Sequence, residues 1–187
     1  MRAMSRLFPI LALSVGLLLA SPAAGKANRP RSLLNRPAPA LSIPDLDNNR
    51  IELENYRGKV VLLNFWATWC APCRLEIPRF VEWQRQYGPR GLQVLGISID
   101  DSDPPVRELV KKLNVNYPVA MGDAKLGIRY GGVLGVPVIF LIDRRGIVRA
   151  RFDGQPDLVV VDSRVRSLLE MQGSALQPWP SPKSATR

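Results

Sequence analysis

The stretch FWATWCAPCRLEIP, residues 65–78, contains Cys70 and Cys73, the only two cysteines among 187 residues. A disulfide between them would close a loop too short to stabilise a fold by much. A structural zinc site needs four ligands, and the chain has two cysteines and no histidine. The spacing therefore favours redox chemistry. It leaves two other interpretations open: a two-coordinate Cu(I) site, because soft thiolates select that ion, and a buried inert pair.

The flanking residues predict how the two sulfurs are presented. Val60–Trp66 is a continuous apolar run typical of a buried strand, and a helix is expected over residues 71–87, which puts Cys70 at the helix N-terminus. The free N–H groups and the dipole of the helix favour a thiolate there, so the pKa of Cys70 should fall and its sulfur should attack. Cys73 lies one turn further on the same face and is expected to resolve the mixed disulfide.

The lack of histidine excludes several classes of site. Ser-His hydrolases, Cys-His hydrolases and His-ligated metal centres are ruled out, and no metal ligand set is predicted. A proton acceptor must then be a carboxylate, a water molecule or a neighbouring thiolate. Glu76 is the candidate carboxylate, three residues after Cys73 on the same helix. The alternative is that Glu76 is only a first-turn acid favoured by the helix dipole.

The net charge of +10 suggests a nucleic-acid partner until the charges are located. Eight of the 26 basic residues lie in residues 1–44 and 173–187, which contain no acid, so residues 45–172 hold 18 basic against 16 acidic residues. No basic stripe with interleaved aromatic residues is present. The sequence therefore predicts no nucleic-acid partner.

The two ends of the chain differ from its middle. Residues 1–27 are predicted to be a signal peptide, with Arg2 and Arg6 before an apolar run and small residues after it. Since no charge falls within Leu7–Gly25, an uncleaved membrane anchor is the alternative, and either places the folded part in the periplasm, where disulfides form. The other predicted segments are a linker over 28–40, one domain over 41–172 and a disordered tail over 173–187.

The middle of the chain alternates strand and helix patterns, which predicts an α/β fold with a mixed sheet and helices on both faces. Two short strands are expected within 44–53. Further strands are expected over 60–66, 92–100, 136–143 and, after a turn at 143–146, in a partner strand, with a short strand or loop over 116–123. Helices are expected over 71–87, 104–113, 124–130 and 157–171.

These motifs together resemble a known family. NFWATWCAPC, the following Glu76-Ile77-Pro78 and the downstream GVPVIFLID are similar to the TlpA/ResA/CcmG group of extracytoplasmic thiol–disulfide oxidoreductases. The resemblance covers residues 38–171. It implies a thioredoxin-like fold, with a mixed central sheet flanked by helices, an N-terminal β-hairpin and a helix–strand insert over 101–131.

The resemblance also implies roles for single residues. Cys70 would be the exposed nucleophile, Cys73 the resolving cysteine and Glu76 the active-site acid. Pro137 resembles the family's cis-proline, which faces the disulfide, although an ordinary proline at a strand entry is the alternative. Pro78 resembles the proline that kinks the active-site helix, and a helix irregularity without functional consequence is the alternative.

Two positions depart from related patterns. Asn64 stands where thioredoxin itself has a buried aspartate, so that acid is not available as a proton relay; this group often has asparagine there. Val138 stands where the CcmG branch usually has an acidic residue. The second departure weakens an assignment to cytochrome c maturation and leaves copper-centre assembly proteins open as substrates.

The resulting hypothesis is a monomeric periplasmic reductase of cysteine-containing partner proteins, either apocytochrome c or metal-centre assembly proteins. It would need no cofactor beyond the Cys70–Cys73 disulfide, and a membrane thiol donor would keep it reduced. Partners would bind an apolar rim made of five residues: Trp69, Ala71, Pro72, Val136 and Pro137. Alternatives are a thiol oxidase, a Cu(I) chaperone, and a peroxidase of the Thr-x-x-Cys type, although Thr68 lies only two residues before Cys70.

Overall fold

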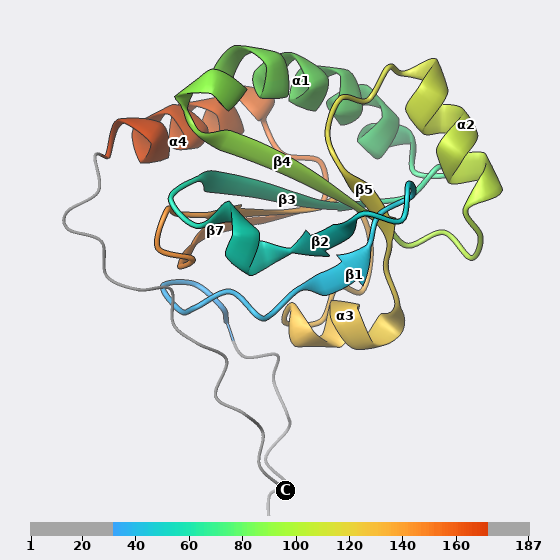
Figure 1. Ribbon diagram of the computed structural model, residues 1–187, viewed down its shortest axis with the longest axis horizontal. Coiled ribbons are helices and arrows are strands. Elements are labelled where there is room, and N and C mark those ends of the chain that lie inside the picture. Colours follow the sequence, from blue (N-terminus) through green and yellow to red (C-terminus); the bar gives the residue numbers. More distant parts are fainter. Residues whose placement is uncertain (1–31, 172–187) are drawn as a thin grey trace, which may run out of the picture.

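A computed structural model describes residues 32–171 of the chain (Figure 1). The predicted signal peptide or anchor lies outside the described residues, as does the predicted disordered tail. Within residues 32–171, no helix is long and apolar enough to cross a membrane.

The core of the fold is a five-stranded mixed sheet with the strand order β5-β4-β3-β6-β7. Strand β3 runs parallel to β4, and β4 runs parallel to β5, whereas β6 is antiparallel to both β3 and β7. All seven residues of β3 are buried, because neighbours cover both of its edges and helices or loops cover both faces. The strands are β3 (Val60–Trp66), β4 (Leu92–Ser98), β5 (Val119–Met121), β6 (Val138–Ile142) and β7 (Val148–Asp153).

Two layers cover the sheet, as Figure 1 shows. Helices α1 (Ala71–Tyr87) and α4 (Leu158–Glu170) lie on one face. The other face carries helix α3 (Ala124–Arg129) and a small hairpin of β1 (Ser42–Pro44) and β2 (Arg50–Glu52). Side chains of β3 alternate between these layers, so Leu62 and Trp66 pack under α1 while Leu63 and Phe65 face the hairpin side. The thioredoxin-like α/β fold predicted from the sequence is confirmed.

The remaining elements connect these layers. Helix α2 (Pro104–Lys112) lies between β4 and β5, within the predicted insert. Two short 3-10 helices occupy Leu53–Tyr56 and Gly88–Arg90. Predicted and observed bounds of the longer elements agree within two residues. Strand β6 begins at Val138 rather than at residue 136, because Pro137 has no N–H to donate to a strand ladder.

The prediction of a linker over residues 28–40 is wrong for its last part. The Asn35 N–H donates to the Val148 carbonyl at 2.8 Å, the Val148 N–H donates to the Arg36 carbonyl at 2.9 Å, and Ala38 donates to Gly146 at 2.8 Å. Ala38 is buried. This segment pairs with Gly146, Ile147 and Val148, at the start of the outer edge of β7, where a proline is tolerated because only one side of the backbone is paired.

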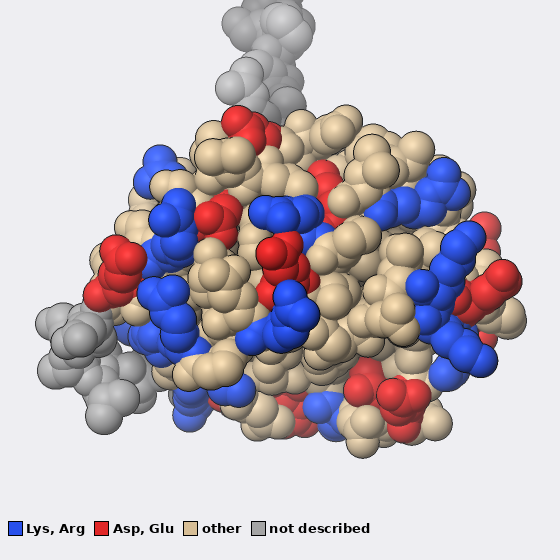
Figure 2. All heavy atoms as spheres, turned by 90° about the horizontal axis from the view of Figure 1, so that it is seen from above, with Lys and Arg blue, Asp and Glu red and all other residues tan. Residues whose placement is uncertain are grey.

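The face covered by α1 and α4 carries both signs of charge. Figure 2 shows basic and acidic side chains interleaved across it. Two of the ion pairs lie on these helices, Arg79–Glu82 at 2.6 Å and Arg166–Asp162 at 3.0 Å. Exposed pairs of this kind contribute little to stability.

Candidate active site

The two cysteines lie where strand β3 ends and helix α1 begins. Cys70 is the N-cap of α1, and its Sγ accepts a hydrogen bond from the Cys73 N–H at 3.2 Å. Pro72 lies in the first turn of the helix, where a missing N–H leaves no hydrogen bond unmade. Cys70 and Cys73 form a disulfide, with their Cα atoms 5.3 Å apart. The predicted start of the helix beside Cys70 is confirmed.

The expectation that Cys70 is exposed is wrong for this disulfide form. Only 4% of the residue is exposed, and Cys73 is fully buried. Both cysteines belong to the apolar cluster under α1, together with Trp66 and Ala67. The sulfur of a partner can therefore reach Cys70 only through a small opening, and most of the contact surface must come from neighbouring residues.

The predicted apolar rim has exposed and buried members. Trp69 is 65% exposed and Ala71 is also exposed, whereas Pro72 and Val136 are half-buried. Pro137 is buried, and the Val136–Pro137 peptide bond is cis, as predicted. Because Val138 pairs with Phe65, Pro137 lies opposite the last residue of β3, at the edge of the sheet where the chain turns toward Cys70.

Glu76 lies in the interior of α1 and does not interact with solvent. The residue is 2% exposed, and neither carboxylate oxygen has a hydrogen-bond partner among the described residues. Burial raises the pKa of Glu76 from 4.5 to about 7. The alternative of a first-turn acid favoured by the helix dipole is therefore wrong. The carboxyl group is poised to accept or donate a proton near neutral pH, one helical turn from Cys73.

Asn64 is a second buried polar residue in the same layer. It is fully buried in the middle of β3, and within residues 32–171 neither polar atom of its side chain has a partner. Its side chain lies on the same face of the strand as Leu62 and Trp66, which is the face that α1 covers. A buried polar group without a hydrogen-bond partner lowers the free energy of unfolding by about 1–3 kcal/mol. Asn64 and Glu76 are two such residues in an otherwise apolar core.

A residue that sequence reasoning missed holds the turn between β3 and α1. Asp100, just beyond the end of β4, accepts hydrogen bonds from the Thr68 N–H at 2.9 Å and from the Thr68 hydroxyl at 2.6 Å. The Ser98 hydroxyl also donates to Asp100, at 2.7 Å. Thr68 is two residues before Cys70, so Asp100 positions the loop that presents the disulfide. The sequence did contain a signal for this role, since Asp100 is an acidic residue at the end of the apolar run that forms β4.

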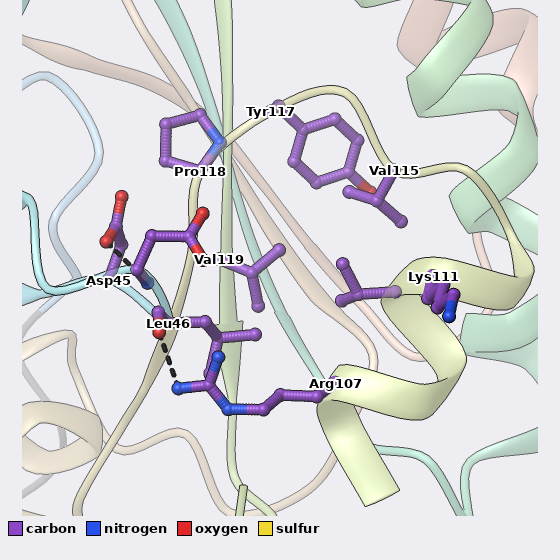
Figure 3. A pocket seen from close by; sticks show the side chains of 10 residues that line it. Asp45, Leu46, Arg107, Lys111, Val115, Tyr117, Pro118 and Val119 are labelled. Carbon is purple, nitrogen blue, oxygen red and sulfur yellow. Dashed lines mark hydrogen bonds between the residues drawn. The ribbon is translucent and has the colours of Figure 1, made fainter. Parts of the chain in front are cut away.

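A separate depression lies between the hairpin tip, α2 and the start of β5 (Figure 3). None of the residues that line it belongs to the site predicted from the sequence. Arg107 crosses its edge and donates to the Leu46 carbonyl and to Asp103. The Leu46 N–H in turn donates to the Val119 carbonyl at 2.8 Å. These contacts tie the hairpin to the insert.

Among the described residues, no group of three or more His, Cys, Asp or Glu side chains could hold an ion. The site contains the Cys70–Cys73 disulfide, the buried carboxyl of Glu76 and the exposed side chain of Trp69.

This sheet, with a Cys-x-x-Cys disulfide at the helix after β3 and a cis-proline before β6, defines a thioredoxin-fold thiol–disulfide oxidoreductase. The model of the AhpC/TSA family matches residues 34–151, and the chain belongs to that family. Its relatives include the thiol-disulfide oxidoreductase ResA of Bacillus thuringiensis subsp. konkukian, which is 35% identical over 122 residues, covering 65% of this chain and 70% of ResA. ResA of Bacillus subtilis is 32% identical over 111 residues, covering 59% and 62%.

Solved structures agree with this class. A thioredoxin-family thiol:disulfide interchange protein from Chlorobium tepidum TLS is 33% identical, with a TM-score of 0.66 over 71% of this chain and 95% of that chain. A secreted Mycobacterium tuberculosis disulfide oxidoreductase homologous to E. coli DsbE shares the fold at 20% identity, with a TM-score of 0.61 over 68% and 96%. The activity predicted from the sequence, thiol–disulfide exchange at a Cys-x-x-Cys disulfide, is confirmed.

Proposed function

We propose that this oxidoreductase works in the reducing direction, outside the cytoplasm, on disulfides of partner proteins. The observation that carries the direction is the buried, unpaired carboxyl of Glu76 one turn from Cys73. An ionised carboxylate there repels a thiolate, which disfavours the reduced dithiol relative to the disulfide. Oxidants of this fold work because their reduced form is stabilised, so the opposite arrangement favours a reductant.

In the proposed cycle, two electrons pass from the Cys70–Cys73 dithiol to the substrate disulfide. The Cys70 thiolate attacks the substrate disulfide, one substrate thiolate leaves, and a mixed disulfide forms. Glu76 then accepts the proton of the Cys73 thiol, and the new thiolate attacks Cys70 Sγ. The second substrate sulfur leaves as a thiolate as the Cys70–Cys73 disulfide forms, and the proton held by Glu76 passes to it, while the first takes up a proton from water. A membrane dithiol donor then reduces the Cys70–Cys73 disulfide with two electrons and becomes a disulfide itself.

The partners follow from the same site. Cysteine-containing proteins, either apocytochrome c or metal-centre assembly proteins, are the proposed substrates in the periplasm. The exposed Trp69 and Ala71 supply an apolar surface that does not depend on a particular charge pattern. The signal peptide or membrane anchor predicted over residues 1–27 supports a location outside the cytoplasm, where disulfides of partner proteins form. We expect a monomer that needs neither nucleic acid nor a further cofactor.

The first test is the reduction potential of the Cys70–Cys73 pair, measured against glutathione or dithiothreitol buffers. A value near the roughly −270 mV of thioredoxin supports a reductant, whereas a value near the roughly −120 mV of DsbA makes the protein a donor of disulfides. In Glu76→Gln the potential should rise, because the repulsive carboxylate is gone. An unchanged potential in that variant would contradict the role given to Glu76.

Variants of the cysteines test the order of attack. Cys70→Ser should abolish disulfide reduction, and Cys73→Ser should accumulate mixed disulfides with substrate proteins, visible on non-reducing gels. Full turnover by Cys73→Ser with a dithiol donor would refute the two-cysteine cycle. Copper titration and peroxide consumption by the reduced protein address the other two candidates, a Cu(I) chaperone and a peroxidase.

A further inference from the structure

The loop between α3 and β6 carries the most exposed large apolar side chain of the described chain. Leu134 is 95% exposed and lies three residues before Pro137. Beside it is a depression of about 320 Å³ whose apolar wall consists of Leu134, Val136 and Val138. A single exposed leucine is common on protein surfaces. Leu134 differs because it borders a depression on the loop that leads to the cis-proline, which indicates a contact surface.

The polar side of this depression is formed by Arg151 and Asp153, whose charges pair with each other. Arg151 donates from Nε and one terminal nitrogen to Asp153, at 2.7–3.0 Å. Its remaining N–H groups reach the carbonyls of Tyr130, Gly131 and Gly132, at 3.1–3.3 Å. All five guanidinium donors are therefore engaged, and Arg151 has none left for an anionic ligand. The depression suits an apolar group.

The strand register places the depression beside the end of β3. Val138 pairs with Phe65 of β3 on one side and with Asp153 of β7 on the other. Neighbouring strands lie about 4.8 Å apart, so the depression lies about 5–10 Å to the side of the end of β3, where the chain turns to Cys70. An extended peptide advances about 3.3 Å per residue, so two or three residues span this sideways distance. Val138 packs on the face of the sheet opposite the cysteines, and Val136 packs against the core clusters of both faces, so the loop before β6 connects the depression to the side of the disulfide.

We propose that this depression, the Leu134 pocket, binds an apolar side chain of the substrate protein two or three residues from its reacting cysteine. We assign the pocket to the substrate because it adjoins the proposed apolar rim. Val136 lines the pocket and is also a member of that rim, which a substrate would cover to reach Cys70. The inference rests on the proposed function, because it assigns part of substrate recognition to this reducing site. It predicts selection for apolar sequence beside the cysteine rather than for charge.

The test uses disulfide-bonded peptides with one leucine placed two or three residues before or after the cysteine, and matched peptides with serine there. With the reduced protein, leucine at one of these positions should raise kcat/KM about tenfold, a factor worth roughly 1.4 kcal/mol. In Leu134→Ser this preference should fall below about threefold. Ile128→Ser is the matched control, because Ile128 is 73% exposed on α3 but does not line the pocket.

The outcomes separate the two proposals. Equal rates for leucine and serine peptides would overturn the inference, as would a loss in Leu134→Ser that is the same for every peptide. Both results leave the reductase itself intact. If the reduced protein attacks none of the peptides, the proposed function fails as well. Thermal unfolding of each variant is followed by circular dichroism. Because Leu134 is exposed, Leu134→Ser should have the same melting temperature as the unmodified protein.

Discussion

Burial of one carboxyl group decides how this site handles protons. Glu76 faces the apolar layer between α1 and the sheet, and its pKa rises from 4.5 to about 7 because water no longer solvates the charge. The same group on the surface of α1 would ionise well below neutral pH and could not exchange protons with Cys73 at pH 7. A single side chain therefore links the redox step to pH.

Glu76 should make the stability of the oxidised protein fall as pH rises. Its folded pKa lies above the unfolded value, so the folded state binds the proton more tightly, and the contribution of Glu76 to stability is fully present only below about pH 4.5. This contribution is lost as the pH rises from about 4.5 to about 7. At roughly 1.4 kcal/mol per pKa unit, the free energy of unfolding falls by up to about 3 kcal/mol. Urea unfolding of the disulfide form at pH 5 and pH 8 measures the loss.

Glu76→Gln should remove most of this pH dependence, because the amide does not ionise. Glu170→Gln is the matched control, since Glu170 is exposed at the end of α4. The difference between pH 5 and pH 8 should persist in that control. A Glu76→Gln protein that loses as much stability over this range as the unmodified chain would show that other groups cause the effect.

Glu76 should also control the second chemical step. In Glu76→Gln the Cys73 thiol lacks its proton acceptor, so release of the mixed disulfide should slow by on the order of 100-fold at pH 7. Attack by Cys70 should change little, because that sulfur is at the helix N-cap. Rapid quenching with acid, followed by mass spectrometry, should show accumulating mixed disulfide. Its absence would contradict a proton transfer to Glu76.

At the scale of elements, the site depends on a hydrogen-bonded connection between two parallel strands. Thr68 follows β3 and Asp100 follows β4, and the carboxylate of Asp100 binds both the backbone and the hydroxyl of Thr68. Since the C-terminal ends of parallel strands meet at one edge of the sheet, this contact fixes the turn that presents Cys70. The end of β3, the end of β4 and the cap of α1 are thereby held together.

Replacing Thr68 tests whether this connection serves the chemistry. Thr68→Val keeps the shape and removes the hydroxyl donor, so one bond to Asp100 is lost and a carboxylate oxygen is left without it. We expect the rate of Cys70 attack to fall about tenfold and the pKa of the Cys70 thiol, read from the pH dependence of alkylation, to rise. Thr68→Ser retains the hydroxyl and should restore both.

A purely structural role for Thr68 would give a different pattern. The free energy of unfolding would fall by about 1–2 kcal/mol while the alkylation pKa of Cys70 stayed the same. Equal behaviour of Thr68→Val and Thr68→Ser would likewise argue against a positioning role for the hydroxyl.

At the scale of the whole molecule, the segment before the hairpin completes the sheet. Backbone bonds join residues 35–38 to the β6–β7 turn region, and Tyr130 donates from its hydroxyl to the Pro39 carbonyl at 2.9 Å. These contacts cover the start of the β7 edge, which would otherwise be free to pair with another chain. The folded unit therefore begins before residue 41.

Shortening the chain tests this boundary. A chain that begins at Leu41 should be about 2–4 kcal/mol less stable than one that begins at residue 32, because several backbone bonds and the burial of Ala38 are lost. At about 2–4 °C of Tm per kcal/mol, the melting temperature should fall by roughly 4–16 °C. Equal melting temperatures for the two chains would mean that the edge segment contributes nothing.

Local sequence patterns were sufficient for most of the fold. The apolar run Val60–Trp66, the Cys70 cap and the 71–87 helix depend on neighbours three or four residues apart, and their predicted bounds agree with β3 and α1. The cis-proline followed from motif resemblance rather than from spacing. The redox pair itself was evident from composition, because two cysteines without histidine leave few other chemistries.

By itself, then, the sequence determined the class of chemistry, the order of the elements and the cysteine that begins the helix, since all of these are written in short-range periodicity and residue type. Only the tertiary structure decided the burial of Glu76, the contact of Asp100 with Thr68 and the edge role of residues 35–38. The reason is physical: solvent exposure and hydrogen bonds between residues 32 or more apart depend on how the layers pack, which no local pattern encodes.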